Sequence, residues 1–215
     1  MDTNYMYNQK PWQKASFYNN PNMNYPTNLN LVSYTETRQP TNMYYFANIP
    51  MGLAKSLEGK YFTGVAEDLE FGNATHAWAR LYNPPDSGVN LFVNVWTASD
   101  LSSSPFKVQI WLNSNPPGII QESTLVTPSN TAFVPLSKPR VKLEYAVGEK
   151  GFPTGGIKTF GRNGLAGTTI NSEEEGKFIF PPGGSFLVHL SNPRNPTLPA
   201  AGSVAFGWWE EPIQQ

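Results

Sequence analysis

The sequence predicts an all-β protein, an antiparallel β-sandwich that is jelly-roll-like, preceded by an extended N-terminal arm. Three observations lead to this fold class. Short segments rich in β-branched and aromatic residues recur from about residue 60 onward. The chain contains 20 prolines and 18 glycines, many of them between these segments, as turns between strands require. The composition also changes sharply near residue 50, which separates the arm from the sandwich.

The predicted strands alternate with short turn sequences such as NPPDSG, NSNPPG and PPGG, in which proline fixes φ and glycine permits a positive φ. Many short strands with such turns are typical of a sandwich or a jelly roll. The strands are expected at residues 61–71, 76–83, 89–98, 106–113, 119–126, 140–147, 176–180, 185–191 and 203–210.

The N-terminal region, residues 1–48, reads as an arm that connects subunits, and residues 49–215 read as the β-sandwich domain. The arm is rich in asparagine and tyrosine and is broken by prolines, with too few aliphatic residues for a core of its own. Its aromatic rings can bury large areas and still form hydrogen bonds. Within the arm, residues 28–38 alternate as an extended strand does. The arm residues expected at an assembly contact are Phe17, Tyr18, Tyr25, Leu29, Leu31, Tyr34, Tyr44, Tyr45 and Phe46.

Alternation of side chains assigns faces to two strands in the middle of the chain. In residues 89–98, the set that contains Leu91, Val93 and Val95 is expected in the core, which puts Trp96 on the outer face. In residues 106–113, Val108 and Ile110 are expected in the core and Trp111 outside. The two strands are expected to pair as a hairpin across the DLSSSP connection.

The C-terminal stretch SVAFGWWE, residues 203–210, reads as the closing strand of the sheet. Alternation places Val204, Phe206 and Trp208 in the core and Trp209 outside. Gly207 is expected at a bulge or where a neighbouring ring approaches closely. Trp96, Trp111 and Trp209 together form the predicted outer aromatic surface.

Residues that could carry catalysis or bind metal are few. The two histidines, His76 and His189, have no second His, Cys or well-spaced carboxylate beside them in the sequence and read as ordinary strand residues. The NSEEEGK stretch, residues 171–177, reads as a solvated turn, and the glycine-rich residues 148–167 read as a long surface loop because the features of a phosphate loop are missing. The serines lack a GxSxG motif. No enzymatic activity, no cofactor and no metal are expected.

Charge and cysteine content bear on partners and location. A formal net charge of -1 gives no basic surface for nucleic acid, and no segment is apolar and long enough to span a membrane. The absence of cysteine excludes disulfides and thiolate chemistry. The N-terminal residues lack the apolar core of a secretory signal, so synthesis in the cytoplasm without a signal peptide is expected.

Several stretches in the same order resemble an uncharacterised family of spore-forming Gram-positive bacteria, known as domain of unknown function 6143. They are AWARLYNPPDSGVNLFVNVWT, QIWLNSNPPG, FIFPPGGSFLV and VAFGWWEE, within residues 55–211. The resemblance implies no activity and no catalytic residue. The architecture is also similar, more loosely, to spore-appendage subunits, in which an N-terminal extension of a β-sandwich inserts into a neighbouring subunit. Those subunits commonly use cysteines for cross-links, which this chain lacks.

Two functions are consistent with these observations. The favoured one is a structural subunit that assembles with itself into a filament or surface layer by non-covalent insertion of the arm into a neighbour, with the spore surface or an extracellular fibre as the expected location. The alternative is a carbohydrate-binding module that uses exposed tryptophans, since aromatic rings stack on sugars. The partner is then a glycan rather than a second copy.

Overall fold

A computed structural model describes residues 31–34, 45–193 and 196–213. The chain divides into two compact units, residues 1–54 and residues 55–215. The division lies six residues beyond the boundary expected from composition. Each unit is described by itself below.

The first unit contains a two-stranded antiparallel sheet. Strand β1 (Leu31–Tyr34) pairs with β2 (Tyr45–Asn48). β1 lies inside the predicted strand 28–38. Helix α1 (Met51–Leu57) was not expected from the sequence, and it begins in this unit, where the Ala54 amide donates to the Pro50 carbonyl. No helix in the described ranges is long and apolar enough to cross a membrane.

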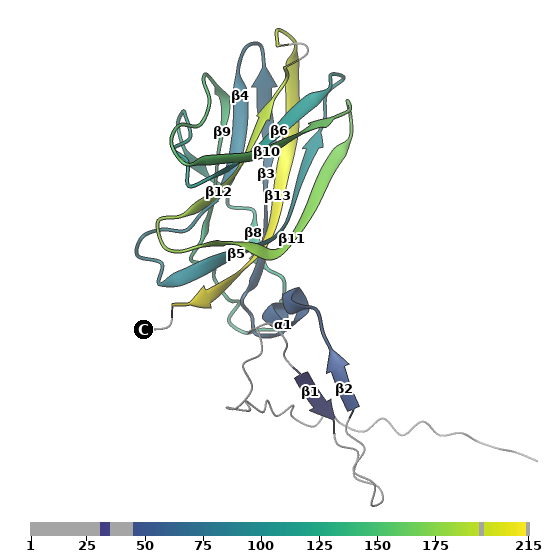
Figure 1. Cartoon of the computed structure of the whole chain (residues 1–215), viewed down its shortest axis with the longest axis vertical. Coiled ribbons are helices and arrows are strands. Elements are labelled where there is room, and N and C mark those ends of the chain that lie inside the picture. The colour runs from purple at the N-terminus through teal and green to yellow at the C-terminus, as the bar shows by residue number, and fades with distance from the viewer. Residues whose placement is uncertain (1–30, 35–44, 194–195, 214–215) are drawn as a thin grey trace, which may run out of the picture. The chain divides into compact units, whose positions relative to one another are not determined.

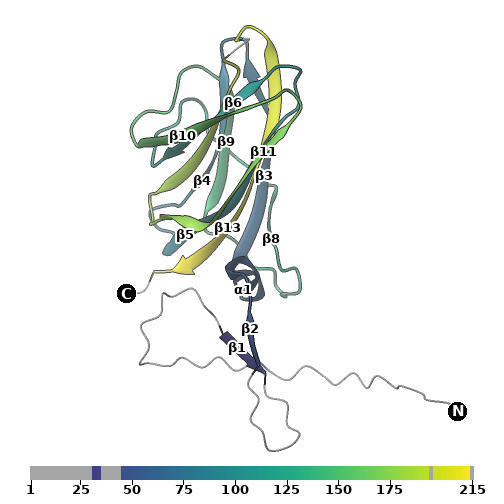
Figure 2. The same ribbon diagram turned by 45° about the vertical axis from the view of Figure 1, so that its right-hand side comes forward.

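The second unit is a sandwich of two antiparallel sheets, as predicted (Figure 1). Figure 2 shows the two layers, with β4 and β9 in one and β3 and β8 in the other. The five-stranded sheet has the order β11 (Thr169–Phe180), β5 (Val89–Asp100), β13 (Pro199–Pro212), β3 (Tyr61–Gly72) and β8 (Val126–Pro128). The six-stranded sheet has the order β10 (Ile157–Gly164), β6 (Phe106–Leu112), β12 (Ser185–Ser191), β4 (His76–Tyr82), β9 (Lys142–Glu149) and β7 (Gln121–Glu122).

The strand order is that of a jelly roll. Strands β7 to β9 form an insertion. Without them, successive strands along the chain from β3 to β13 alternate between the two sheets. The exception is the step from β6 to β10, because these two strands are neighbours in the six-stranded sheet. The hairpin predicted between residues 89–98 and 106–113 is therefore wrong. β5 and β6 belong to different sheets, because the connection between them crosses from one layer to the other. A turn sequence alone does not tell such a crossing from a hairpin.

The core lies between the sheets, and alternation identified many of its members. Val93 and Leu91 of β5 and Ile110 of β6 are fully buried, and so are Val204 and Trp208 of β13. The largest buried side chains of this core include Trp96, Trp208, Phe106, Phe186, Leu69, Leu81 and Leu143. Burial of these apolar groups supplies most of the driving force for folding.

The C-terminal strand is not at an edge. β13 lies between β5 and β3 and pairs with both over most of its length. Gly207 lies where the register with β5 shifts, and a side chain there would clash with the Tyr61 hydroxyl. Both predicted reasons for this glycine are confirmed. The aromatic residues near the C-terminus thus form the middle of the five-stranded sheet.

Two segments that were expected to be irregular form strands. The glycine-rich residues 148–167 contain β10, which pairs with β6, so the prediction of one long loop is wrong. Residues 171–177 lie inside β11 rather than in a separate turn. Asn171 to Glu173 pair with β5, and the register shift that follows accommodates residues 174–177 as a bulge. Polar residues are tolerated in both strands because both lie at sheet edges.

Candidate functional site

Of the predicted outer tryptophans, Trp111 lies half-buried on the outer face of the six-stranded sheet. It packs beside Trp78 and Leu187 in a small cluster separate from the main core. The Lys158 ammonium lies 5.8 Å from the centre of the Trp111 ring, a cation–π arrangement. Part of this ring is therefore available to a partner.

Trp96 does not lie on the outer face, which corrects the prediction from alternation. Val93 pairs with Trp208 and Val95 pairs with Gly207, so Asn94 is an extra residue in β5. One extra residue reverses which side chains face the core beyond it. Trp96 is consequently 0% exposed, and its indole nitrogen donates to Glu174 at 3.0 Å.

Trp209 faces away from the core but is not exposed. Its ring stacks on Phe92 with centres 5.3 Å apart and planes 8° apart. A Cβ at Gly176, in the bulge of β11, would clash with the indole. This close cover leaves Trp209 only 4% exposed. The predicted aromatic surface therefore reduces to Trp111.

The predicted assembly residues of the arm are only partly within the structure. Phe17, Tyr18, Tyr25, Leu29 and Tyr44 lie outside the described residues. The other four belong to the small sheet of the first unit, where Tyr34 pairs with Tyr45 and Ser33 pairs with Phe46. Leu31 pairs with Asn48 at the end of the same ladder.

An outer edge of the six-stranded sheet is open. β10 pairs with β6 alone, and no other backbone hydrogen bond in the described parts of the chain involves residues 157–164. Six of its eight residues are exposed, with Ile157 at its start 62% exposed. A strand of eight residues with one open side is a template for another strand.

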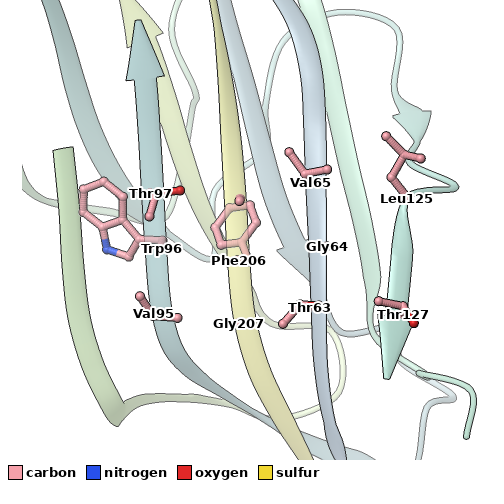
Figure 3. A pocket seen from close by; sticks show the side chains of 11 residues that line it. Thr63, Gly64, Val65, Val95, Trp96, Thr97, Leu125, Thr127, Phe206 and Gly207 are labelled. Carbon is pink, nitrogen blue, oxygen red and sulfur yellow. The ribbon is translucent and has the colours of Figure 1, made fainter. Parts of the chain in front are cut away.

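A shallow groove of about 370 Å³ crosses the outer face of the five-stranded sheet (Figure 3). Small side chains make its floor, because Gly207 and Ala205 of β13 lie between Thr97 of β5 and Thr63 of β3. Leu125 lies at the β8 side. None of its lining residues carries a charge. The groove therefore offers room for an apolar group but no catalytic chemistry.

The two histidines are close together in the fold, although their positions in the sequence did not indicate it. β12 lies between β4 and β6, and His189 of β12 is directly opposite Gln109 of β6. The His76 and His189 ring centres are 4.9 Å apart, and Phe152 packs on both rings. Alternation could have placed each residue on a polar face, but only the topology makes them neighbours.

The surroundings of both imidazoles disfavour their protonated forms. Burial, together with the nearby His76 ring and the Lys158 ammonium, lowers the pKa of His189 to about 3. Burial also lowers the pKa of His76. Within the described ranges no group of three or more His, Asp or Glu side chains could hold a metal ion.

A cleft of about 180 Å³ opens beside these histidines. Its polar lining comes from Lys107 and Gln109 of β6, His76 of β4 and Ser191 of β12, and Phe152 adds an aromatic wall. The Gln109 side-chain oxygen and the His76 Nδ1 are buried and make no hydrogen bond within the described residues. Sequence reasoning missed this cleft, because its members come from three strands and three loops.

The comparisons place the chain in a family without giving it a function. No curated protein and no solved structure matches it. A family model does match, over residues 32–215, and its description is a family of unknown function, DUF6143. The match begins within β1, so it includes part of the region that the sequence resemblance had left out. The chain belongs to the DUF6143 family.

Proposed function

We propose that the protein is a structural subunit that assembles with itself, in which the arm of one copy adds a strand to the β10 edge of the next. The observation that carries this proposal is the open edge of β10, whose eight residues have, among the described residues, a strand partner on one side alone. Backbone hydrogen bonds to an added strand give affinity without a deep pocket. Repetition of such a head-to-tail contact gives a filament or a layer unless the rotation closes a ring.

β10 suits an added strand better than the other edges of the two sheets do. β7 and β8 have two and three residues, too few for a stable ladder. β11 is longer, but the bulge at residues 174–177 interrupts its ladder. β10 has one irregularity, between Lys158 and Phe160, and regular pairing from Phe160 to Gly164.

The charges on β10 leave room for a partner strand. Lysine and arginine often protect sheet edges from pairing with other chains. Here the Lys158 ammonium lies over the Trp111 ring, and the Arg162 guanidinium lies 5.3 Å from the centre of the Phe160 ring. Both cations are thus held against rings of their own sheet. The arm supplies uncharged side chains, as in the LVSY sequence of β1.

The absence of cysteine allows a direct test by cross-linking. Two single variants, Ser33→Cys in the arm and Asn163→Cys on β10, are mixed and oxidised. We expect disulfide-linked dimers in the mixture, because the two positions come from different copies. The matched control replaces Asn163→Cys by Ser203→Cys, a half-buried position on β13, which is paired with a strand on both sides, and should give few dimers.

Deletion of residues 1–48 provides the second measurement. Light scattering should show a folded monomer in place of multimers, since the added strand is gone. Equal assembly of the truncated and full chains, or equal cross-linking to both cysteine positions, would contradict the proposal.

The carbohydrate-binding alternative depends on Trp111. This residue is half-buried, whereas Trp96 and Trp209 are buried, and it lies beside Lys158. Strong binding on a glycan array that is lost in Trp111→Ala, with unchanged oligomeric state, would favour the glycan. The proposed location, at a spore surface or in an extracellular fibre, follows from the assembly proposal and is tested with it by microscopy of the purified assembly.

A further inference from the structure

The cleft beside the histidines has the composition of a small-molecule site. Apolar groups form most of its wall and a few polar groups converge within it, as in ligand pockets generally. The apolar part of the wall consists of Ala74, Phe152, Pro193 and Pro196, and Thr75 and Asn192 also line the cleft. At about 30 Å³ for one water, its 180 Å³ suit a molecule of a few non-hydrogen atoms.

The charge of the cleft favours an anion over a cation. Lys107 lines it and forms no ion pair within the described residues. A second ammonium, on Lys158, lies near enough to His189 to oppose its protonation. No Asp or Glu is among the lining residues. A carboxylate beside Lys107 would form a charge-assisted hydrogen bond.

The unpartnered atoms also call for a hydrogen-bond donor on the ligand. Gln109 is only 4% exposed, and its side-chain oxygen lacks a donor within the described residues. The buried Nδ1 of His76 also lacks a partner there and, in a neutral ring, can accept or donate. A buried acceptor without a donor has lost its hydrogen bonds to water without replacement, and a hydroxyl group of a ligand would supply the missing donor.

We propose that this cleft binds a small hydroxy acid, an anion that carries a hydroxyl group next to its carboxylate. The carboxylate accepts from Lys107 and Ser191, and the hydroxyl donates to Gln109. The carbon atoms of the ligand pack against Phe152. This site is separate from the β10 edge and does not depend on the assembly proposal.

The test uses NMR of the two imidazoles in the full chain, which contains only two histidines. Long-range proton–nitrogen spectra are recorded during titration with lactate, propionate, inorganic phosphate and zinc chloride, and His76→Asn assigns the signals. We expect lactate to shift the His76 signals in a saturable way. Propionate, which lacks the hydroxyl, should bind about tenfold more weakly, since one hydrogen bond of this kind is worth about 1.4 kcal/mol.

Lys107→Met should weaken lactate binding at least tenfold. The matched control is Lys177→Met, an exposed lysine on β11 in the other sheet, which should bind lactate as the wild type does. A well-dispersed amide spectrum shows that each variant folds.

Four outcomes of the lactate, propionate and zinc titrations would overturn the proposal. They are the absence of a saturable shift with lactate, equal affinities for lactate and propionate, equal lactate affinities of the wild type and Lys107→Met, and tighter binding of zinc than of lactate. Phosphate that binds more tightly than lactate would also contradict it, because the recognised group would then be a phosphate.

Discussion

The two outer faces of the sandwich both bury aromatic side chains, but with different chemistry. On the five-stranded sheet, Trp209 stacks on Phe92 beneath the bulge at Gly176, in apolar surroundings. On the six-stranded sheet, Trp78 is fully buried and its indole nitrogen donates to the carbonyl of Pro117 at 2.8 Å. Segments of the same chain cover both rings. Facing away from the core and being exposed are therefore different properties in this fold.

The second difference is polarity. The outer face of the six-stranded sheet holds the Arg80–Glu144 ion pair, with nitrogen and oxygen 2.6 Å apart and both side chains largely buried. The same face holds His189. The five-stranded sheet instead has an uncharged groove. The outer face of the six-stranded sheet, the polar face, is therefore stabilised by pairing between polar side chains. The outer face of the five-stranded sheet, the apolar face, is stabilised by close packing.

The largest expected effect concerns the core between the faces. Ile110→Asp places a charge among fully buried apolar residues and should cost several kcal/mol, enough to unfold many domains. Asn94→Asp should be nearly silent, because the Tyr61 hydroxyl, which now accepts from Asn94 at 2.8 Å, can donate to a carboxylate. Thermal melts compare the two variants. Similar melting temperatures would mean that Ile110 does not lie in the core.

The next largest loss of stability is expected from the Arg80–Glu144 ion pair on the polar face. Arg80→Met leaves the Glu144 carboxylate buried without its partner and should cost about 3 to 5 kcal/mol. The double variant Arg80→Met with Glu144→Leu should recover most of this loss, since a buried pair can be replaced by apolar groups at little cost. Urea unfolding of the single and double variants measures both. Additive losses would show that the pair does not act as a unit.

Much of the fold could be predicted from the sequence, and the reasons for the failures are physical. Periodicity gave the core faces of β6 and β13, because each strand keeps its alternation across the core. It failed at Trp96, since a bulge at Asn94 has no strong sequence signal. The β10 strand was hidden by its glycines and charges, which an edge strand tolerates. The cleft could not be predicted, because Lys107, Gln109 and His76 meet only through the jelly-roll order.

The buried histidine of the polar face makes stability depend on pH. The pKa of His189 is about 3 in the folded state and about 6.5 when unfolded, so the unfolded chain binds the proton first. The contribution of neutral His189 to the free energy of unfolding is fully present above pH 6.5 and is lost progressively as the pH falls toward 3. The Gly151 backbone favours the protonated form but offsets only part of this shift. The free energy of unfolding should fall by about 1.4 kcal/mol per pH unit in this window.

His189→Gln is the control, because glutamine does not titrate. Other groups also titrate, and burial raises the pKa of Glu210, which acts in the opposite direction. Subtraction of the variant's pH profile from that of the wild type removes such shared terms. Urea unfolding at several pH values from 4 to 7 gives the two profiles. Parallel profiles would show that His189 is accessible to protons in the folded state.

The smallest effect tests the packing of the apolar face with two glycines that both have a positive φ. Gly176 has φ +77° and lies against the Trp209 ring, whereas Gly183 has φ +86° and nothing within 4 Å of an added Cβ. Gly183→Ala should cost only the backbone strain, about 1 to 2 kcal/mol. Gly176→Ala should cost about 1 to 3 kcal/mol more, because the methyl group must displace the indole from Phe92. Urea unfolding gives both losses, and a change in tryptophan fluorescence in Gly176→Ala alone reports the displaced ring. Equal losses without that change would mean that the bulge of β11 does not cover Trp209, and the apolar face would then be open to solvent.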